Sequence, residues 1–175
     1  MTLLDILPVE KWIELEMEIN KRSNLNASVF DVDGIRITDF KKWANRLCPV
    51  VKADEKGQSY ICAVAHQNAA HQAQRTGKPA IVECDAGLVK VVVPLFIDGE
   101  FLGVAGGCGL LLKDSKVDTF LVNKTTDIPV EEIENLSNDI AAISMEELKS
   151  VIKYIEKELE WIKYNYQNQR MFSAG

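Results

Sequence analysis

The sequence has little of what several large classes of protein require. It has 2 histidines in 175 residues, and its 4 cysteines form no Cys-x-x-Cys pair, which excludes a zinc site built from neighbouring residues of the chain. Acidic residues outnumber basic ones, 26 to 20, so the net charge is −6, whereas a nucleic-acid binder needs a basic surface. The apolar stretch 101–112 is too short to cross a bilayer, and the acidic N-terminus is untypical of a signal peptide. We therefore expect a cytoplasmic protein with no membrane span and no nucleic-acid partner.

The residues that are present are typical of a globular domain. Hydrophobic residues make up 47% and charged residues 26%, which is enough for a buried core without disulfides or a structural metal. Local periodicity and turn signals predict the following elements in order: a helix over 8–21, a hairpin around Asp33-Gly34, helices over 40–47 and 54–75, strands over 80–84, 89–97 and 101–112, and helices over 114–123 and 130–143. An antiparallel sheet flanked by helices, with a long C-terminal helix, is an α+β fold.

Two of the predicted strands carry unusual residues. The strand 89–97 is nearly all apolar, so we expect both of its faces to be covered. Pro94 removes one backbone donor from that strand and predicts a bulge or a sheet edge. Four glycines follow in the next strand, at positions 103, 106, 107 and 109. They do not form a nucleotide-binding loop, and they indicate either the close approach of a ligand or helix, or a simple strand irregularity.

The last third of the chain predicts a long helix from Ser144. Ser144 and Glu147 form an S-x-x-E capping box. Apolar residues then follow at spacings of four and three, as in a coiled-coil seam: Leu148, Ile152, Ile155, Leu159, Ile162 and Tyr166. This seam either forms a homodimer or folds back onto the sheet. We favour the homodimer, because the seam is longer than one small sheet could cover.

Motifs spread along the chain are similar to those of one family. The most specific is Cys84-Asp85-Ala86-Gly87-Leu88 followed by Pro94, and the others are Leu4-Asp5-Ile6, Asp31-Val32-Asp33-Gly34, Leu47-Cys48, Cys62, Gly77-Lys78-Pro79, Asp98-Gly99 and Leu102-Gly103. On these residues the chain resembles the PocR sensory domain, a PAS-like module of bacterial and archaeal regulators, chemoreceptors and histidine kinases. The resemblance implies a PAS-like sheet, the sensing of a small molecule such as a simple hydrocarbon derivative, and no catalytic activity.

The sequence departs from the family pattern at two positions where a ligand could bind. Cys108 follows Gly106-Gly107 where the family usually has Gln, and Asp85 replaces a usual His. With this resemblance we divide the chain into a sensory domain, 1–143, and a signalling or dimerisation helix, 144–170. The output domain or partner protein is not identified by the sequence.

The cysteines and one histidine are the candidate site residues. Cys62 and His66 are four residues apart and share one helix face, whereas His71 points away from Cys62. Four cysteines could hold a metal ion or an iron–sulfur cluster as cofactor, carry redox chemistry, or pack as small apolar residues.

The first hypothesis is a non-catalytic sensory domain. It would bind a small ligand between the sheet and the helix 54–75 and signal through its C-terminal helix, with these ligand-binding candidates: Cys48, Cys62, His66, Cys84, Asp85, Val93 and Cys108. The alternative is a metal, iron–sulfur or redox sensor that uses the four cysteines, Cys48, Cys62, Cys84 and Cys108.

Overall fold

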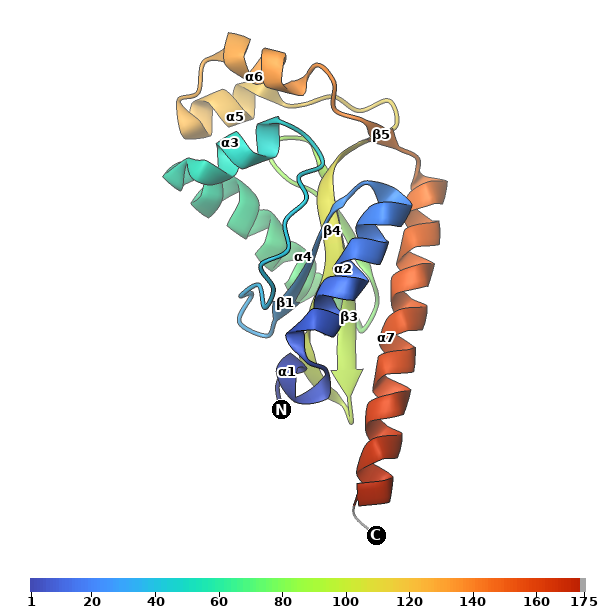
Figure 1. Cartoon of the computed structure of the whole chain (residues 1–175). Coiled ribbons are helices and arrows are strands. Elements are labelled where there is room, and N and C mark those ends of the chain that lie inside the picture. The colour runs from blue at the N-terminus through green and yellow to red at the C-terminus, as the bar shows by residue number, and fades with distance from the viewer. Residues whose placement is uncertain (174–175) are drawn as a thin grey trace.

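The computed structural model of the chain describes residues 1–173 and places one sheet between two layers of helices (Figure 1). Four strands pair antiparallel in the order β1-β4-β3-β2, and a short fifth strand pairs parallel with β4. Their bounds are β1 (Asn26–Asp31), β2 (Ala80–Glu83), β3 (Val89–Ile97), β4 (Glu100–Leu112) and β5 (Ala142–Ile143). The predicted α+β fold with an antiparallel sheet is therefore confirmed.

The helices divide between the two faces and one end of the sheet. On one face lie α1 (Leu3–Ile6), α2 (Val9–Ser23) and α7 (Met145–Ser173). On the other face lie α3 (Leu47–Ala53), a π-helical turn η1 (Gly57–Cys62) and α4 (Ala63–Thr76). The pair α5 (Thr119–Thr126) and α6 (Val130–Ser137) lies beside α3 at one end of the sheet (Figure 1).

Strand β1 shows how successive residues serve the two faces. Ala27 and Val29 belong to the core that α2 and α7 cover. Asn26, Ser28 and Phe30 alternate with them and point to the opposite face, as the period of two in a strand requires. The two faces therefore differ in chemistry from the first strand onward.

Both faces of β3 are covered, as its apolar sequence predicts. Val91 and Val93 pack in the core under α2 and α7, whereas Val92 packs against α4. Pro94 lies beyond Val92, the last residue of β3 that pairs with β2. Its missing N–H therefore falls at a local sheet edge, and the β3–β4 register shifts one residue further along.

The long C-terminal helix packs against the protein's own core. Ser144 and Glu147 form the predicted capping box, with the Ser144 N–H donating to the Glu147 carboxylate at 2.8 Å. The seam residues Leu148 and Ile155 are fully buried against α2 and β3. The seam is thus not a free surface, and it supports the fold-back alternative rather than the dimer favoured from the sequence.

Four local predictions differ from the structure, one of them the helix expected over 114–123, which runs from Thr119 to Thr126. Residues 40–46 are irregular up to α3, and contacts to residues outside this segment hold them: the Arg36 guanidinium donates to the Phe40 carbonyl, and the Asn45 side chain donates to the Gly109 carbonyl. The predicted hairpin around Asp33-Gly34 forms but is short, with an antiparallel bridge between Phe30 and Arg36 and two backbone hydrogen bonds between its arms. The helix predicted over 130–143 ends at Ser137, since Ala142–Ile143 pairs with β4 instead.

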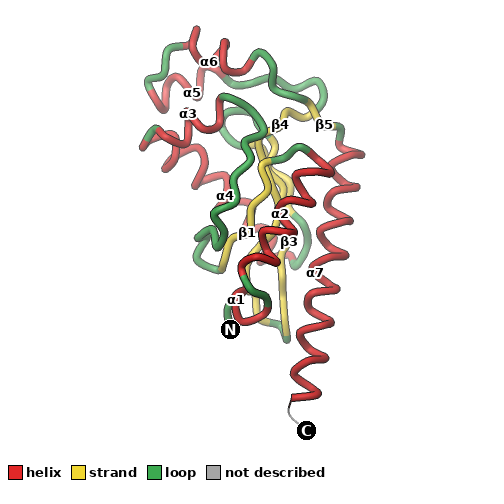
Figure 2. Tube along the Cα trace, in the orientation of Figure 1, coloured by secondary structure: helices red, strands yellow, loops and turns green. Residues whose placement is uncertain are grey.

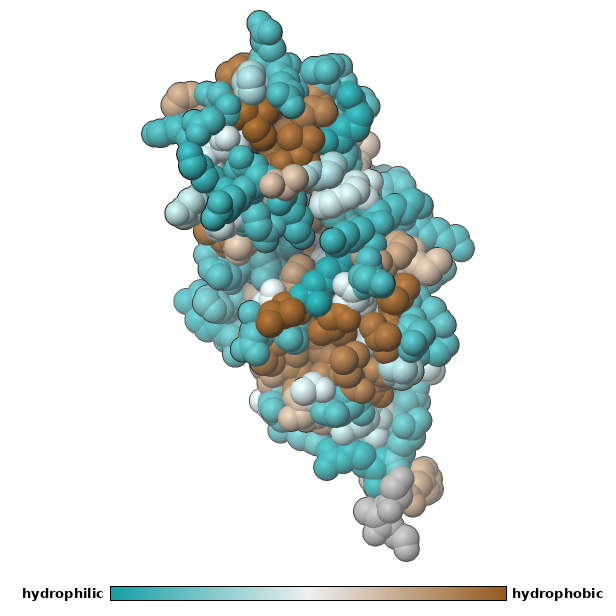
Figure 3. Space-filling model, turned by 60° about the vertical axis from the view of Figure 1, so that its left-hand side comes forward, coloured by the Kyte–Doolittle hydropathy of each residue, from teal (hydrophilic) through white to brown (hydrophobic). Residues whose placement is uncertain are grey.

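The loop from β1 to α3 runs beside the sheet rather than away from it (Figure 2). On the face shown in Figure 3, hydrophobic residues gather in an upper and a lower area of a mostly hydrophilic surface. Within residues 1–173, no helix is both long and apolar enough to cross a membrane.

Candidate ligand-binding cavity

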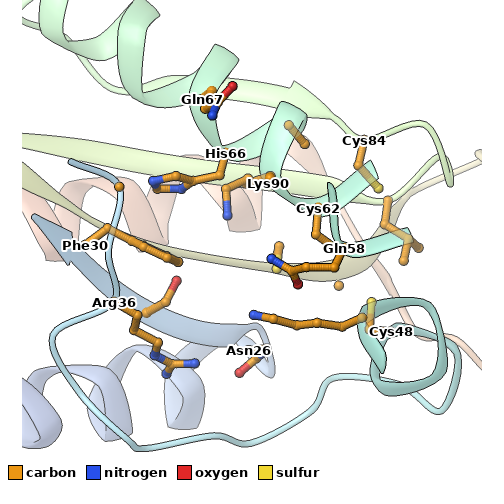
Figure 4. Close-up of a pocket in the computed structure, with 18 of the residues that line it drawn as sticks. Asn26, Phe30, Arg36, Cys48, Gln58, Cys62, His66, Gln67, Cys84 and Lys90 are labelled. Atoms are coloured by element: carbon orange, nitrogen blue, oxygen red, sulfur yellow. The ribbon is translucent and has the colours of Figure 1, made fainter. Parts of the chain in front are cut away.

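A cavity of about 170 Å³ lies between the sheet and the layer formed by α3, η1 and α4. Its floor is a row of three side chains from adjacent strands, because Asn26 of β1 and Lys90 of β3 both pair with Cys108 of β4. Figure 4 shows Lys90 and Gln58 directing their polar ends into the same space. The register of the sheet, rather than closeness in sequence, brings this row together.

A β-bulge at Gly109 shapes one end of the cavity. The register of β3 and β4 shifts here, and Gly109 has a φ of 103°, which favours glycine. The Asn45 amide nitrogen donates to the Gly109 carbonyl at 2.6 Å, and its amide oxygen accepts from the Cys48 N–H at 2.7 Å. Asn45 therefore ties the start of α3 to β4 and holds Cys48 at the cavity. Bulges of this kind are frequent beside functional sites.

The helical wall presents Gln58, Cys62 and His66 at intervals of four residues. Gln58 and Cys62 belong to the π-helical turn η1, and His66 belongs to α4. All three line the cavity, so the expectation that Cys62 and His66 share one face agrees with the structure. Isolated π-helical turns inside longer helices frequently mark functional sites.

His66 is buried without a hydrogen bond. Its side chain is 7% exposed, and neither ring nitrogen has a partner. The Phe30 ring lies beside it at 3.9 Å between centroids, and Gly34 of the β1–α3 loop lies against its edge. Burial, together with the charges of Lys90 and Lys52, lowers its pKa to about 3. The imidazole is therefore neutral at pH 7 and offers one donor and one acceptor.

Other polar groups of the cavity also lack partners. The side-chain oxygens of Asn26 and Gln58 are buried and accept no hydrogen bond. Lys90 is 7% exposed, and its ammonium lies 5.4 Å from the centre of the Phe30 ring. Buried polar groups in folded proteins almost always have a partner. Several buried polar groups without a partner are nevertheless gathered around this one cavity.

All four cysteines are free and line this cavity. Burial raises the pKa of Cys62 to about 11 and also raises the pKa of Cys48 and Cys84. These three thiols are therefore protonated at neutral pH. Across residues 1–173, no three His, Cys, Asp or Glu side chains are arranged to hold a metal ion. The geometry gives the metal alternative no support beyond the closeness of the thiols.

Two of the seven candidate site residues lie away from the cavity. Asp85 is exposed in the turn after β2. Val93 packs in the core under α2 and α7, because the alternation of β3 directs it away from Lys90's face. The other five line the cavity: Cys48, Cys62, His66, Cys84 and Cys108.

Sequence reasoning missed several polar residues of the lining. Among them are Asn26, Lys52, Gln58 and Lys90. Lys90 carried a usable signal, since it is the charged residue inside an otherwise apolar strand. The other three carried none, because polar residues at these positions are equally typical of exposed surface.

The fold and the cavity define an α+β domain that can enclose a small molecule between a sheet and a helical layer. A family model described as "Sensory domain found in PocR" matches residues 5–162. The chain therefore belongs to the PocR sensory-domain family, and the resemblance predicted from its motifs is confirmed. No curated protein and no solved structure matches the chain.

Proposed function

We propose that this sensory domain binds a small molecule in the cavity over Asn26, Lys90 and Cys108, and that it does so without catalysis. The observation that carries the proposal is the set of buried, unsatisfied polar atoms on Asn26, Gln58 and His66. They come from a strand, a π-helical turn and a helix and face one cavity. A sensory family accounts for such a site, since a ligand that satisfies these atoms stabilises one arrangement of the elements around it.

The signal leaves the cavity through α2 and α7 in this proposal. Arg36 lines the cavity, and its guanidinium contacts the buried Glu16 carboxylate of α2 at 3.4 Å. Helix α2 in turn packs on α7, where the Arg22 guanidinium lies 4.0 Å from the centre of the Tyr154 ring. A ligand that shifts the β1–α3 loop would therefore act on α7 through one packed helix.

The outer face of α7 is the surface we propose for output. Trp161 and Tyr164 are 61% and 64% exposed there, while the seam on the opposite side is buried. The homodimer, if it uses this helix, would form on that outer face. The cytoplasmic location, the division at residue 143 and the PAS-like character stay predictions of the sequence.

A thermal-shift screen of small organic compounds tests the binding site. Cys108→Leu fills the floor of the cavity, and Cys108→Ala is its matched control because it leaves the space open. We expect binding compounds to raise the melting temperature of the wild type and of Cys108→Ala, but not of Cys108→Leu. An equal shift in all three proteins would mean that the compounds bind elsewhere.

Hydrogen exchange tests the route of the signal. With a compound that passes the screen, we expect slower exchange in the β1–α3 loop and a change in α7. A change confined to the cavity wall would contradict signalling through α7.

The cysteine-based sensor keeps one observation in its favour, the four thiols around one cavity. Metal analysis and an absorption spectrum of protein purified without air test it. A stoichiometric metal that Cys62→Ser abolishes would support the alternative over the proposal.

A further inference from the structure

Two ammonium groups face the cavity without a carboxylate partner. Lys90 stands on its floor and Lys52 of α3 at its rim, and no ion pair of residues 1–173 includes either side chain. Asp33, also on the lining, is exposed and pairs with neither lysine. Arg36 differs from them because Glu16 already neutralises it. A buried ammonium without a counter-charge is unfavourable, and an anion in the cavity would remove this cost.

The two lysines act on the same part of the cavity. Both line the cavity with His66, and the positive charges of both oppose protonation of its ring. Burial also lowers the pKa of Lys52, which is the effect of bringing an ammonium into a partly closed site without a partner. One small anion beside His66 could pair with both lysines.

The remaining unsatisfied groups require a hydrogen-bond donor from the ligand. The oxygens of Asn26 and Gln58 accept nothing, and neutral His66 has one free acceptor nitrogen. A simple carboxylate offers acceptors alone and would leave these atoms unpaired. Each hydroxyl group on the same molecule would donate to one of them.

The size of the cavity bounds the ligand. A cavity of about 150 Å³ holds a benzene molecule, and this one measures about 170 Å³. A ligand on the order of six to ten non-hydrogen atoms fits such a space, whereas a nucleotide does not. Phe30 and Leu88 on the lining provide apolar contacts for its carbon atoms.

We infer that the ligand class is the small hydroxycarboxylates, with the carboxylate between Lys52 and Lys90 and a hydroxyl group that donates to one of the acceptors on Asn26, Gln58 and His66. This inference rests on the proposed function, because it names the chemistry that the sensory cavity recognises.

A matched set of small molecules tests the class by calorimetry and thermal shift. Glycerate, lactate and malate are the hydroxycarboxylates, while glycerol lacks the charge, propionate lacks the hydroxyl, and inorganic phosphate is a simple anion. We expect at least one hydroxycarboxylate to bind roughly tenfold or more tightly than the three controls, since hydrogen bonds to charged groups are the stronger ones. Equal binding of glycerol or of phosphate would overturn the inference, as would the absence of binding by all three hydroxycarboxylates.

Lysine variants test which groups carry the recognition. Lys90→Met and Lys52→Gln are expected to weaken hydroxycarboxylate binding roughly tenfold or more. Lys52→Arg keeps the positive charge and should retain most of the binding affinity. Lys149→Met, on the exposed side of α7, is the matched control and should bind as the wild type does. Circular dichroism and thermal unfolding establish that each variant is folded. Unchanged binding by folded Lys90→Met would overturn the inference.

The Cys108 variants separate the two proposals. A neutral compound that binds the wild type and Cys108→Ala but not Cys108→Leu would leave the proposed function standing and overturn the ligand class. If no compound of any class distinguishes Cys108→Leu from Cys108→Ala, both proposals fail.

Discussion

The two faces of the sheet treat buried polar groups in opposite ways. Under α2 and α7 the packing is apolar, and Glu16 is 0% exposed. Its carboxylate is hydrogen-bonded, because it accepts from the Val29 N–H at 2.8 Å and from the Thr38 hydroxyl at 2.6 Å. Under α4 the face is hollow, and His66 is nearly as buried but has no partner. The comparison shows a filled core on one face and unpaired polar groups around a cavity on the other, where we propose that a ligand binds.

The largest effect on stability should come from a change on the face that α2 and α7 cover. Glu16→Ala leaves Arg36 and Thr38 without their partner, and we expect it to lower the free energy of unfolding by about 3–5 kcal/mol, because one half of a buried pair is left behind. Chemical denaturation measures the change. Glu14→Ala is the matched control, since Glu14 is an exposed residue of the same helix that pairs with Lys11, and its loss should cost about 1 kcal/mol or less. Equal effects of the two changes would contradict the role of Glu16.

The unpaired His66 on the cavity face predicts that the stability of the protein depends on pH. The pKa of His66 is about 3 in the folded protein against 6.5 as its ordinary value, so below pH 6.5 the unfolded chain binds a proton that the folded protein excludes. Stability is therefore lost as the pH falls from 6.5 towards 3. We expect His66 to account for about 2–3 kcal/mol of the loss between pH 7 and pH 4.

Denaturation at the two pH values, repeated with His66→Gln, measures this contribution. The variant should lose less stability on acidification than the wild type. His71→Gln changes the exposed histidine of the same helix and should behave as the wild type. If His66→Gln loses as much stability between pH 7 and pH 4 as the wild type does, His66 is not the cause of the loss.

A smaller effect of opposite sign is expected at Lys90. Lys90→Met removes a buried ammonium that has no partner, so the ligand-free protein should gain about 1–2 kcal/mol in the free energy of unfolding. Such a gain, together with weaker ligand binding, is typical of a residue kept for function. Lys149→Met is the control, with a change of about 0.5 kcal/mol or less. A loss of stability in Lys90→Met would show that the ammonium is well accommodated without a ligand.

The smallest expected effect is on the reactivity of the buried thiols. Because burial raises the pKa of Cys48, Cys62 and Cys84, the reactive thiolate is scarce at pH 7. Alkylation by iodoacetamide, followed for each cysteine by mass spectrometry, should be roughly tenfold or more slower in the folded protein than in denaturant. Rapid native alkylation of Cys62 would favour the thiol-based sensor instead.

The sequence predicted the elements best where a local signal is strong. Strand β3 has the bounds expected from its β-branched run, and the capping box of Ser144 and Glu147 forms as written in the sequence. The helix expected over 40–47 does not form before Leu47, because Phe40 and Asn45 bond to Arg36 and Gly109, residues outside the segment. The helix predicted over 130–143 ends early, at Ser137. Ala142–Ile143 pairs with β4 instead, and no local pattern in the sequence reveals this pairing.

By itself the sequence determined the fold class, the family and the helix face shared by Cys62 and His66, because these follow from short-range periodicity and motifs. Only the tertiary structure decided which side of each strand faces the cavity, and hence that Lys90 lines the cavity and Val93 does not. It also decided that the apolar seam of α7 is buried against the protein's own core. The physical reason is that a period of two or of three and a half defines which residues lie together, whereas the partner that covers them comes from distant parts of the chain.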